Sequence, residues 1–219
     1  MKQKRPVTIF IIILTVVSLF LLEGCQKAKE PKEVVDEYLK KAQQDPRTMT
    51  TVMSSMNKNY LQQIEDLMKG FEYELQETED MENDESGSER KAVQVTFTGY
   101  DIGEYFRKYL ENFQTDVIQF LGKDHTYTEL VEMMTKDPEK YAELYSAADL
   151  EVFTKYMNEC REAGKTYHTE KGKYGIVAWK YKDSKEWVTN PLAISYHLDW
   201  ITNGVYTDYQ NYKKSVSGE

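Results

Sequence analysis

The chain has 219 residues, 40% of them hydrophobic, and a formal net charge of −9 at pH 7. An acidic chain lacks the basic surface needed to neutralise phosphates, so this balance argues against nucleic acid as a partner. The length is enough for one domain with a hydrophobic core, or for one domain with a helical insertion.

The first residues have the pattern of an export signal. Three basic residues within the first five precede an apolar run from Val7 to Leu22, and Gly24 stands directly before Cys25. The run is shorter than the roughly 20 residues that span a bilayer. The ending LLEGC resembles that of a bacterial lipoprotein signal, which implies cleavage after residue 24 and lipidation of Cys25. Glu23 departs from that pattern, and an uncleaved N-terminal anchor is the alternative.

Removal of residues 1–24 takes away three basic residues and Glu23, which changes the net charge from −9 to −11. We therefore expect the lipid on Cys25, and no basic patch, to hold the protein at the extracytoplasmic side of a bacterial cell membrane. Residues 25–30 are the lipidated cysteine and a polar tether. With Cys25 lipidated, Cys160 has no disulfide partner, so stability must come from packing.

Helical periodicity comes first along the mature chain. Pro31 suits the first turn of a helix. A second helix is predicted from Asp45-Pro46 to Gly70, which would end it. The period then changes to two, which predicts strands over 71–76 and 91–98.

An acidic connection from Glu77 to Glu89 separates these two strands. Its seven carboxylates include Asp80, Glu82, Asp84 and Glu85, and alternating acidic residues could bind calcium. An EF-hand loop needs glycine at its sixth position, which, counted from Asp80, is Glu85. We therefore expect a mobile, solvated connection that binds no structural metal.

Helical signals return in the second half of the chain. Asp101 is a predicted N-cap of a helix that ends at Gly122. Helical patterning then continues over 127–162, breaks at Asp137-Pro138 and ends at Gly164.

The C-terminal part begins with strands and ends with a helix. Strands are predicted at Tyr167, over 173–182 and over 186–190. A final helix is predicted from Asn190-Pro191 to Gly204. Residues 205–219 are predicted to be a polar, tyrosine-rich tail that is partly loose.

Together these elements predict an α+β fold, with an antiparallel sheet of about four strands packed by helices in a single domain over 31–204. Alternation and apolar runs identify the side chains expected to be mainly buried in the sheet. They are Phe71, Tyr73, Val93, Val95, Phe97, Ile176, Val177 and Trp179.

Three segments carry a resemblance: PKEVVDEYLKKAQQ, AVQVTFTGYDIGEYFRKYL and IVAWKYKDSKEWV. They are similar to Gram-positive lipoproteins with a small domain of unknown function, described as cystatin-like or nuclear-transport-factor-2-like. The resemblance covers 31–190 and implies a helix followed by a curved antiparallel sheet. The helical stretch between Gly122 and Gly164 departs from it and is an expected elaboration between the two hairpins.

Motifs for catalysis, metal or cofactor binding are absent from the sequence. No phosphate-binding glycine loop, nucleophile elbow or metalloprotease helix occurs, and the histidines have no metal-ligand spacing. Cys160 could pair with His125, His168 or His197 as nucleophile and base. Its helical spacing from apolar neighbours instead favours a buried, inert thiol.

Aromatic residues are the remaining candidates for function, since tyrosine alone occurs 17 times. Aromatic side chains on a curved sheet could stack on a sugar or an apolar ligand, although the same residues at this spacing also suit a core. The predicted ligand-binding residues are Tyr73, Phe97, Tyr174, Trp179 and Trp187.

The leading hypothesis is a non-catalytic envelope module for a small molecule, a glycan or a protein partner. One alternative is an isomerase or dehydratase of the kind seen on nuclear-transport-factor-2-like folds. Such an enzyme would need a titratable group in an apolar cavity, for which His168 and Asp101 are the candidates. The other alternative is a structural assembly subunit of the cell envelope.

Overall fold

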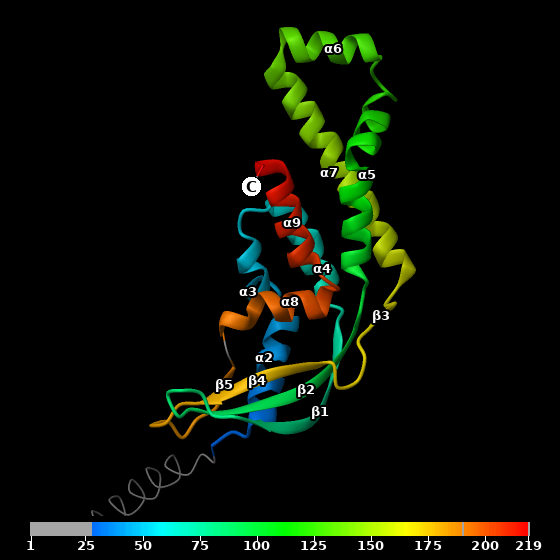
Figure 1. The fold of residues 1–219 in the computed structure, drawn as a ribbon. Coiled ribbons are helices and arrows are strands. Elements are labelled where there is room, and N and C mark those ends of the chain that lie inside the picture. The colour runs from blue at the N-terminus through cyan, green and yellow to red at the C-terminus, as the bar shows by residue number, and fades with distance from the viewer. Residues whose placement is uncertain (1–27, 190, 219) are drawn as a thin grey trace, which may run out of the picture.

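A computed structural model describes residues 28–189 and 191–218. The predicted signal segment 1–24 and Cys25 lie outside these residues. Within the described part, no helix has both the length and the apolar character required to cross a membrane. The architecture is α+β, as predicted, with an antiparallel sheet packed by helices (Figure 1).

The elements follow the chain in nearly the predicted order. The helices are α2 (Pro31–Gln44), α3 (Arg47–Thr50), η1 (Thr51–Met53), α4 (Lys58–Met68), α5 (Ile102–Leu121), α6 (Tyr127–Lys136), α7 (Pro138–Ala163), η2 (Pro191–Ala193), α8 (Ile194–Thr202) and α9 (Val205–Ser217). The strands are β1 (Glu72–Met81), β2 (Glu89–Gly99), β3 (Tyr167–His168), β4 (Tyr174–Lys180) and β5 (Val188–Thr189).

The second predicted helix is interrupted, so the prediction of one continuous helix from 46 to 70 is wrong. Helix α3 and the short turn η1 end at Met53, and α4 begins only at Lys58. Asn57 caps α4, because its side chain accepts a 2.9 Å hydrogen bond from the backbone N–H of Asn59. Short polar residues such as Ser54, Ser55 and Asn57 favour caps and turns over a helix interior, which explains the interruption.

The sheet has the order β1-β2-β4-β5, with every pair antiparallel, and β3 pairs with the end of β2. Helices α2 and α8 contact one of its faces (Figure 1). Tyr73 is half-buried on that face, whereas Val177 and Trp179 alternate to the opposite face and are also only half-buried. The predicted burial is correct for the other five residues, which are Phe71, Val93, Val95, Phe97 and Ile176.

Much of the acidic connection is strand, so the prediction of a mobile segment over 77–89 is wrong. The β1–β2 ladder continues to the Met81–Arg90 pair, beyond a register shift between Leu75 and Thr78. Basic residues of β2 face the acidic strand, and Asp80 forms a 2.9 Å ion pair with Lys91. Only 82–88 remain as a connection. It is an ordered turn in which Asp84 accepts a 2.9 Å hydrogen bond from the Ser88 backbone N–H.

Helices α5, α6 and α7 form the predicted elaboration. Asp101 caps α5 and accepts a 3.0 Å hydrogen bond from the Glu104 backbone N–H. Helices α6 and α7 meet at Asp137-Pro138, the predicted break. The long helices α5 and α7 pack along each other and extend away from the sheet, with α6 across their far end (Figure 1).

The C-terminal residues form α9, so the prediction of a loose tail is wrong for 205–217. Asn203 and Gly204, with φ of 59° and 98°, turn the chain from α8 into α9. Val205 and Tyr209 are buried, and α9 packs against α5 and α8. The apolar side chains recur at helical spacing, which lets a mostly polar segment bury one face.

Candidate functional site

The five predicted ligand-binding residues do not line one cavity. Phe97 is 1% exposed within the core, on the face that the helices cover. On the same face, the Tyr73 hydroxyl donates a 2.8 Å hydrogen bond to Asp36 Oδ1. Tyr174 stacks on Trp200, with ring centroids 4.9 Å apart. These three aromatic residues therefore hold α2 and α8 against the sheet.

The two predicted tryptophans lie elsewhere. Trp179 is on the opposite face, with the Arg90 guanidinium 5.4 Å from its ring centroid. Trp187 precedes β5 and borders a hollow of about 730 Å³, together with Tyr38 of α2. That hollow also includes Ala28, where the described chain begins.

The two candidates for catalysis have structural partners. His168 is exposed, and its Nδ1 lies 3.1 Å from the Thr98 hydroxyl. Besides capping α5, Asp101 accepts a 2.8 Å hydrogen bond from the Asn203 side chain. Neither residue lies in an apolar cavity, which is the environment that the enzyme alternative requires.

His197 and Cys160 are both buried. Burial lowers the pKa of His197 to about 4, so its imidazole is neutral, and its Nδ1 lies 2.8 Å from the Tyr38 hydroxyl. Burial also raises the pKa of Cys160 to about 12, which leaves the thiol protonated and unreactive near neutral pH. Among the described residues, no group of three or more histidines, cysteines and acidic residues could hold a metal ion.

A different cavity lies between helices α4, α5, α7 and α9, and we call it the tyrosine pocket. Its volume is about 330 Å³, which falls in the range of small-molecule sites. It is lined by five aromatic residues, by Asp149 and by smaller residues at its edges. The aromatic residues are Tyr60, Phe106, Tyr109, Tyr209 and Tyr212, and the others are Ser55, Met56, Asn57, Leu110 and Lys213.

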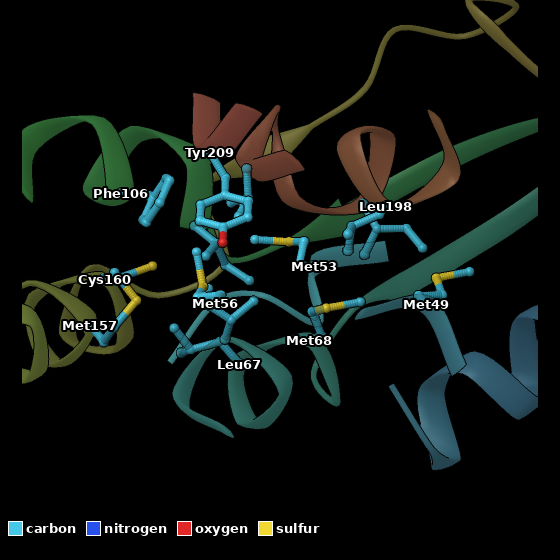
Figure 2. Close-up of a cluster of buried hydrophobic side chains, with 14 of the residues drawn as sticks. Met49, Met53, Met56, Leu67, Met68, Phe106, Met157, Cys160, Leu198 and Tyr209 are labelled. Carbon is cyan, nitrogen blue, oxygen red and sulfur yellow. The ribbon is translucent and has the colours of Figure 1, made fainter. Parts of the chain in front are cut away.

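The pocket is continuous with a methionine-rich part of the core. Figure 2 shows Tyr209 of α9 extending between Met53 and Met56, close to Phe106. These methionines are at most 7% exposed. Methionine is unbranched and flexible, so this wall of the pocket can adapt to the shape of a ligand. The interruption between α3 and α4 is what brings Ser55 and Met56 to the pocket.

Asp149 is the electrostatic centre of the pocket. Its Oδ2 accepts a 2.5 Å hydrogen bond from the Tyr60 hydroxyl, and its Oδ1 accepts a 2.8 Å hydrogen bond from the Tyr109 hydroxyl. Burial, and then the negative charge of Asp149, raise the pKa of Tyr145 and Tyr212. Burial is also the largest cause of the raised pKa of Tyr60 and Tyr109. All four phenols therefore stay protonated and neutral at physiological pH.

Lys213 stands at one edge of the pocket. Its ammonium donates a 3.2 Å hydrogen bond to the Ser55 hydroxyl and lies 5.7 Å from the ring centroid of Tyr209. The hydroxyls of Ser55 and Tyr209 are themselves 2.8 Å apart. The α9 helix therefore supplies both an aromatic wall and a charged group.

The chemistry of these residues suits binding. The lining contributes neutral phenols, a carboxylate, an ammonium group and apolar rings, and no histidine or cysteine belongs to it among the described residues. Polar groups among aromatic walls can orient a ligand and select it.

Sequence reasoning did not find this pocket. Tyr60 and Tyr109 fit the apolar spacing of two predicted helices, which is also typical of core residues, and Tyr209 and Tyr212 lie within the predicted tail. A signal was nevertheless present, since Val205, Tyr209 and Tyr212 recur at the spacing of a helix that covers a core.

Comparisons of the chain with protein-family models, with curated proteins and with solved structures find no match.

Proposed function

We propose that the protein is a non-catalytic, lipid-anchored extracytoplasmic module that binds a small ligand in the tyrosine pocket. One observation carries this proposal. A cavity of about 330 Å³ is lined by five aromatic residues, with the hydrogen-bonded carboxylate of Asp149 among them. Cavities that combine apolar walls with a few placed polar groups are typical small-molecule sites.

The sequence around Cys25 supports the membrane anchor in this proposal. Ala28, the first described residue, is three residues from Cys25, a span of at most about 11 Å. The chain enters the fold at the start of α2, next to the sheet (Figure 1). The tyrosine pocket lies among helices on the side of α8 that faces away from the sheet. An anchor at Cys25 would therefore leave the pocket open to solutes outside the cell.

A screen of small ligands against the full chain tests ligand binding. We expect saturation-transfer NMR, with the protein in a non-ionic detergent, to detect fragments whose binding is lost in Tyr212→Ala. This substitution removes half-buried aromatic surface from the pocket wall.

Tyr196→Ala is the matched control, because Tyr196 lies on α8, is 64% exposed and does not line the pocket. Fragments should bind this variant as they bind the wild-type chain. Failure of every fragment to bind the wild-type chain, or equal binding to wild type and Tyr212→Ala, would contradict the proposed site.

A further inference from the structure

The charge of Asp149 has no cationic partner in the described part of the chain. None of the ion pairs formed there includes this residue. Both of its oxygens accept hydrogen bonds from tyrosine hydroxyls, as expected of an ionised carboxylate. Two neutral donors stabilise this negative charge without cancelling it, so the part of the pocket around Asp149 is electronegative.

The aromatic rings of the pocket also favour a positively charged ligand, in addition to the carboxylate of Asp149. The face of an aromatic ring is negative and attracts a cation within about 6 Å of its centroid. Tyr60 and Tyr109 meet edge to face, with ring centroids 6.1 Å apart, beside the carboxylate that both hydroxyls contact. Tyr212 lines the same cavity from α9. A cation in the pocket would therefore lie among aromatic rings and near a full negative charge.

The protein already places one ammonium group at this cavity. Lys213 Nζ contacts the ring of Tyr209 and the hydroxyl of Ser55, which is the kind of contact that an amine ligand would make. Lys213 does not reach hydrogen-bond distance of Asp149, whose oxygens bind the hydroxyls of Tyr60 and Tyr109. Its charge still lies at the same cavity, so it should oppose the entry of a second cation.

We infer that the tyrosine pocket selects small ligands that carry an ammonium group, with quaternary or tertiary amines as the best fit, and that Lys213 limits their affinity. The inference rests on the proposed function, because it names the ligand class of the same site. Asp149 provides the counter-charge, and the tyrosine rings provide a surface that a methylated ammonium can contact without losing hydrogen bonds to water. The same carboxylate disfavours an anionic group beside it.

Choline and its uncharged carbon analogue, 3,3-dimethylbutan-1-ol, form a matched pair of probes. Both have nearly the same shape and one hydroxyl group, so a difference in affinity reports the charge. Isothermal titration of the full chain in a non-ionic detergent should show choline binding at least about tenfold more tightly than the neutral analogue. Asp149→Asn keeps the shape of the side chain and removes its charge, so it should reduce this preference by weakening the binding of choline more than that of the neutral analogue.

Lys213→Met provides a test that does not depend on weakening the site. Removal of the competing ammonium should raise the affinity for choline about threefold or more, because a like charge at the cavity is lost. Lys214→Met is the matched control, since Lys214 is adjacent on α9 and does not line the pocket. It should leave the affinity unchanged.

Each other outcome overturns the inference. Equal affinity for choline and its neutral analogue would mean a pocket that is indifferent to charge, and the proposed small-ligand function would stand. Tighter binding of a neutral sugar such as glucose would assign the same pocket to a glycan. If neither probe binds while fragments bind in the NMR screen, the inferred preference for cations is rejected and the proposed small-ligand function stands. Absence of binding in both experiments would reject the small-ligand function as well.

Discussion

The hydroxyl of Tyr109 on α5 donates a 2.8 Å hydrogen bond to Oδ1 of Asp149 on α7. This contact joins the two long helices of the elaboration at the wall of the tyrosine pocket. Tyr109 is 5% exposed, so a change at Asp149 would remove a hydrogen bond from a buried hydroxyl. The same hydrogen bond therefore couples the stability of the helical region to the geometry of the pocket.

Tyr109→Phe should lower the free energy of unfolding by about 1.5–3 kcal/mol, the usual range for a hydrogen bond to a charged group. Tyr105→Phe is a control on the same helix, half-buried and outside the pocket lining, and it should stay within about 0.5 kcal/mol of wild type. Urea unfolding followed by circular dichroism measures both. Equal stability of the two variants would show that the contact with Asp149 contributes nothing.

Acid should destabilise the fold through His197. Its pKa falls from the ordinary 6.5 to about 4 because the side chain is buried. Between these values the unfolded chain binds a proton that the folded chain does not. The contribution of neutral His197 to the free energy of unfolding is therefore fully present above pH 6.5. It is lost as the pH falls toward 4, and the loss is at most about 3 kcal/mol.

Unfolding free energies measured from pH 7 to pH 4.5 test this expectation. His197→Gln should flatten the pH dependence, whereas His168→Gln, at an exposed position, should leave the wild-type slope. A wild-type slope in the His197→Gln variant would assign the acid sensitivity to other groups.

Gly103 has no Cβ, which allows the start of α5 to pack closely against the turn between α8 and α9. A Cβ at this position would lie 2.0 Å from the carbonyl oxygen of Asn203 and 2.8 Å from that of Thr202. Backbone atoms cannot move aside as a side chain can, so Gly103→Ala should destabilise the protein by at least about 2 kcal/mol.

Gly122, at the other end of α5, is the matched control for this substitution. The nearest atom to a Cβ there is 3.3 Å away, and φ is −66°. Gly122→Ala should therefore change stability by less than about 1 kcal/mol. Similar melting temperatures for the two alanine variants would contradict the close packing at Gly103.

The proposed lipid anchor leads to a prediction about the two cysteines of the chain. Cys25→Ala should abolish the incorporation of radiolabelled palmitate in cells and release the protein from the membrane fraction, or leave it uncleaved. Cys160→Ala should retain the label, because this residue is buried in the fold. If the Cys25→Ala variant still incorporates the label, the proposed lipidation of Cys25 is wrong.

Local signals predicted the boundaries of many elements. Asp101 and Gly122 bound α5, and Asp137-Pro138 separates α6 from α7, because capping side chains and proline act within one helical turn. The acidic half of β1 was not predicted to be a strand, because its stability depends on a neighbouring strand and not on local signals. Its carboxylates repel one another in isolation, and only the partner strand supplies compensating charges such as Lys91.

The candidate site could not be predicted in the same way. Tyr60, Tyr109, Asp149 and Tyr212 come from four helices that are far apart in the sequence. Each of the three tyrosines fits the apolar spacing of its own helix, so nothing local distinguishes a pocket wall from an ordinary core. Their convergence depends on how α4 and α9 pack beside the α5–α7 pair, which is a property of the tertiary structure.

The most direct test of the central claim follows the tyrosine rings themselves during a titration with choline. In NMR spectra of the full chain with labelled tyrosine rings, the signals of Tyr60, Tyr109, Tyr209 and Tyr212 should shift together and saturate. Those of Tyr127, Tyr181 and Tyr196, which are exposed and outside the pocket, should remain unchanged. Saturable shifts confined to the exposed tyrosines, or no shift at the pocket tyrosines at saturating choline, would contradict the account.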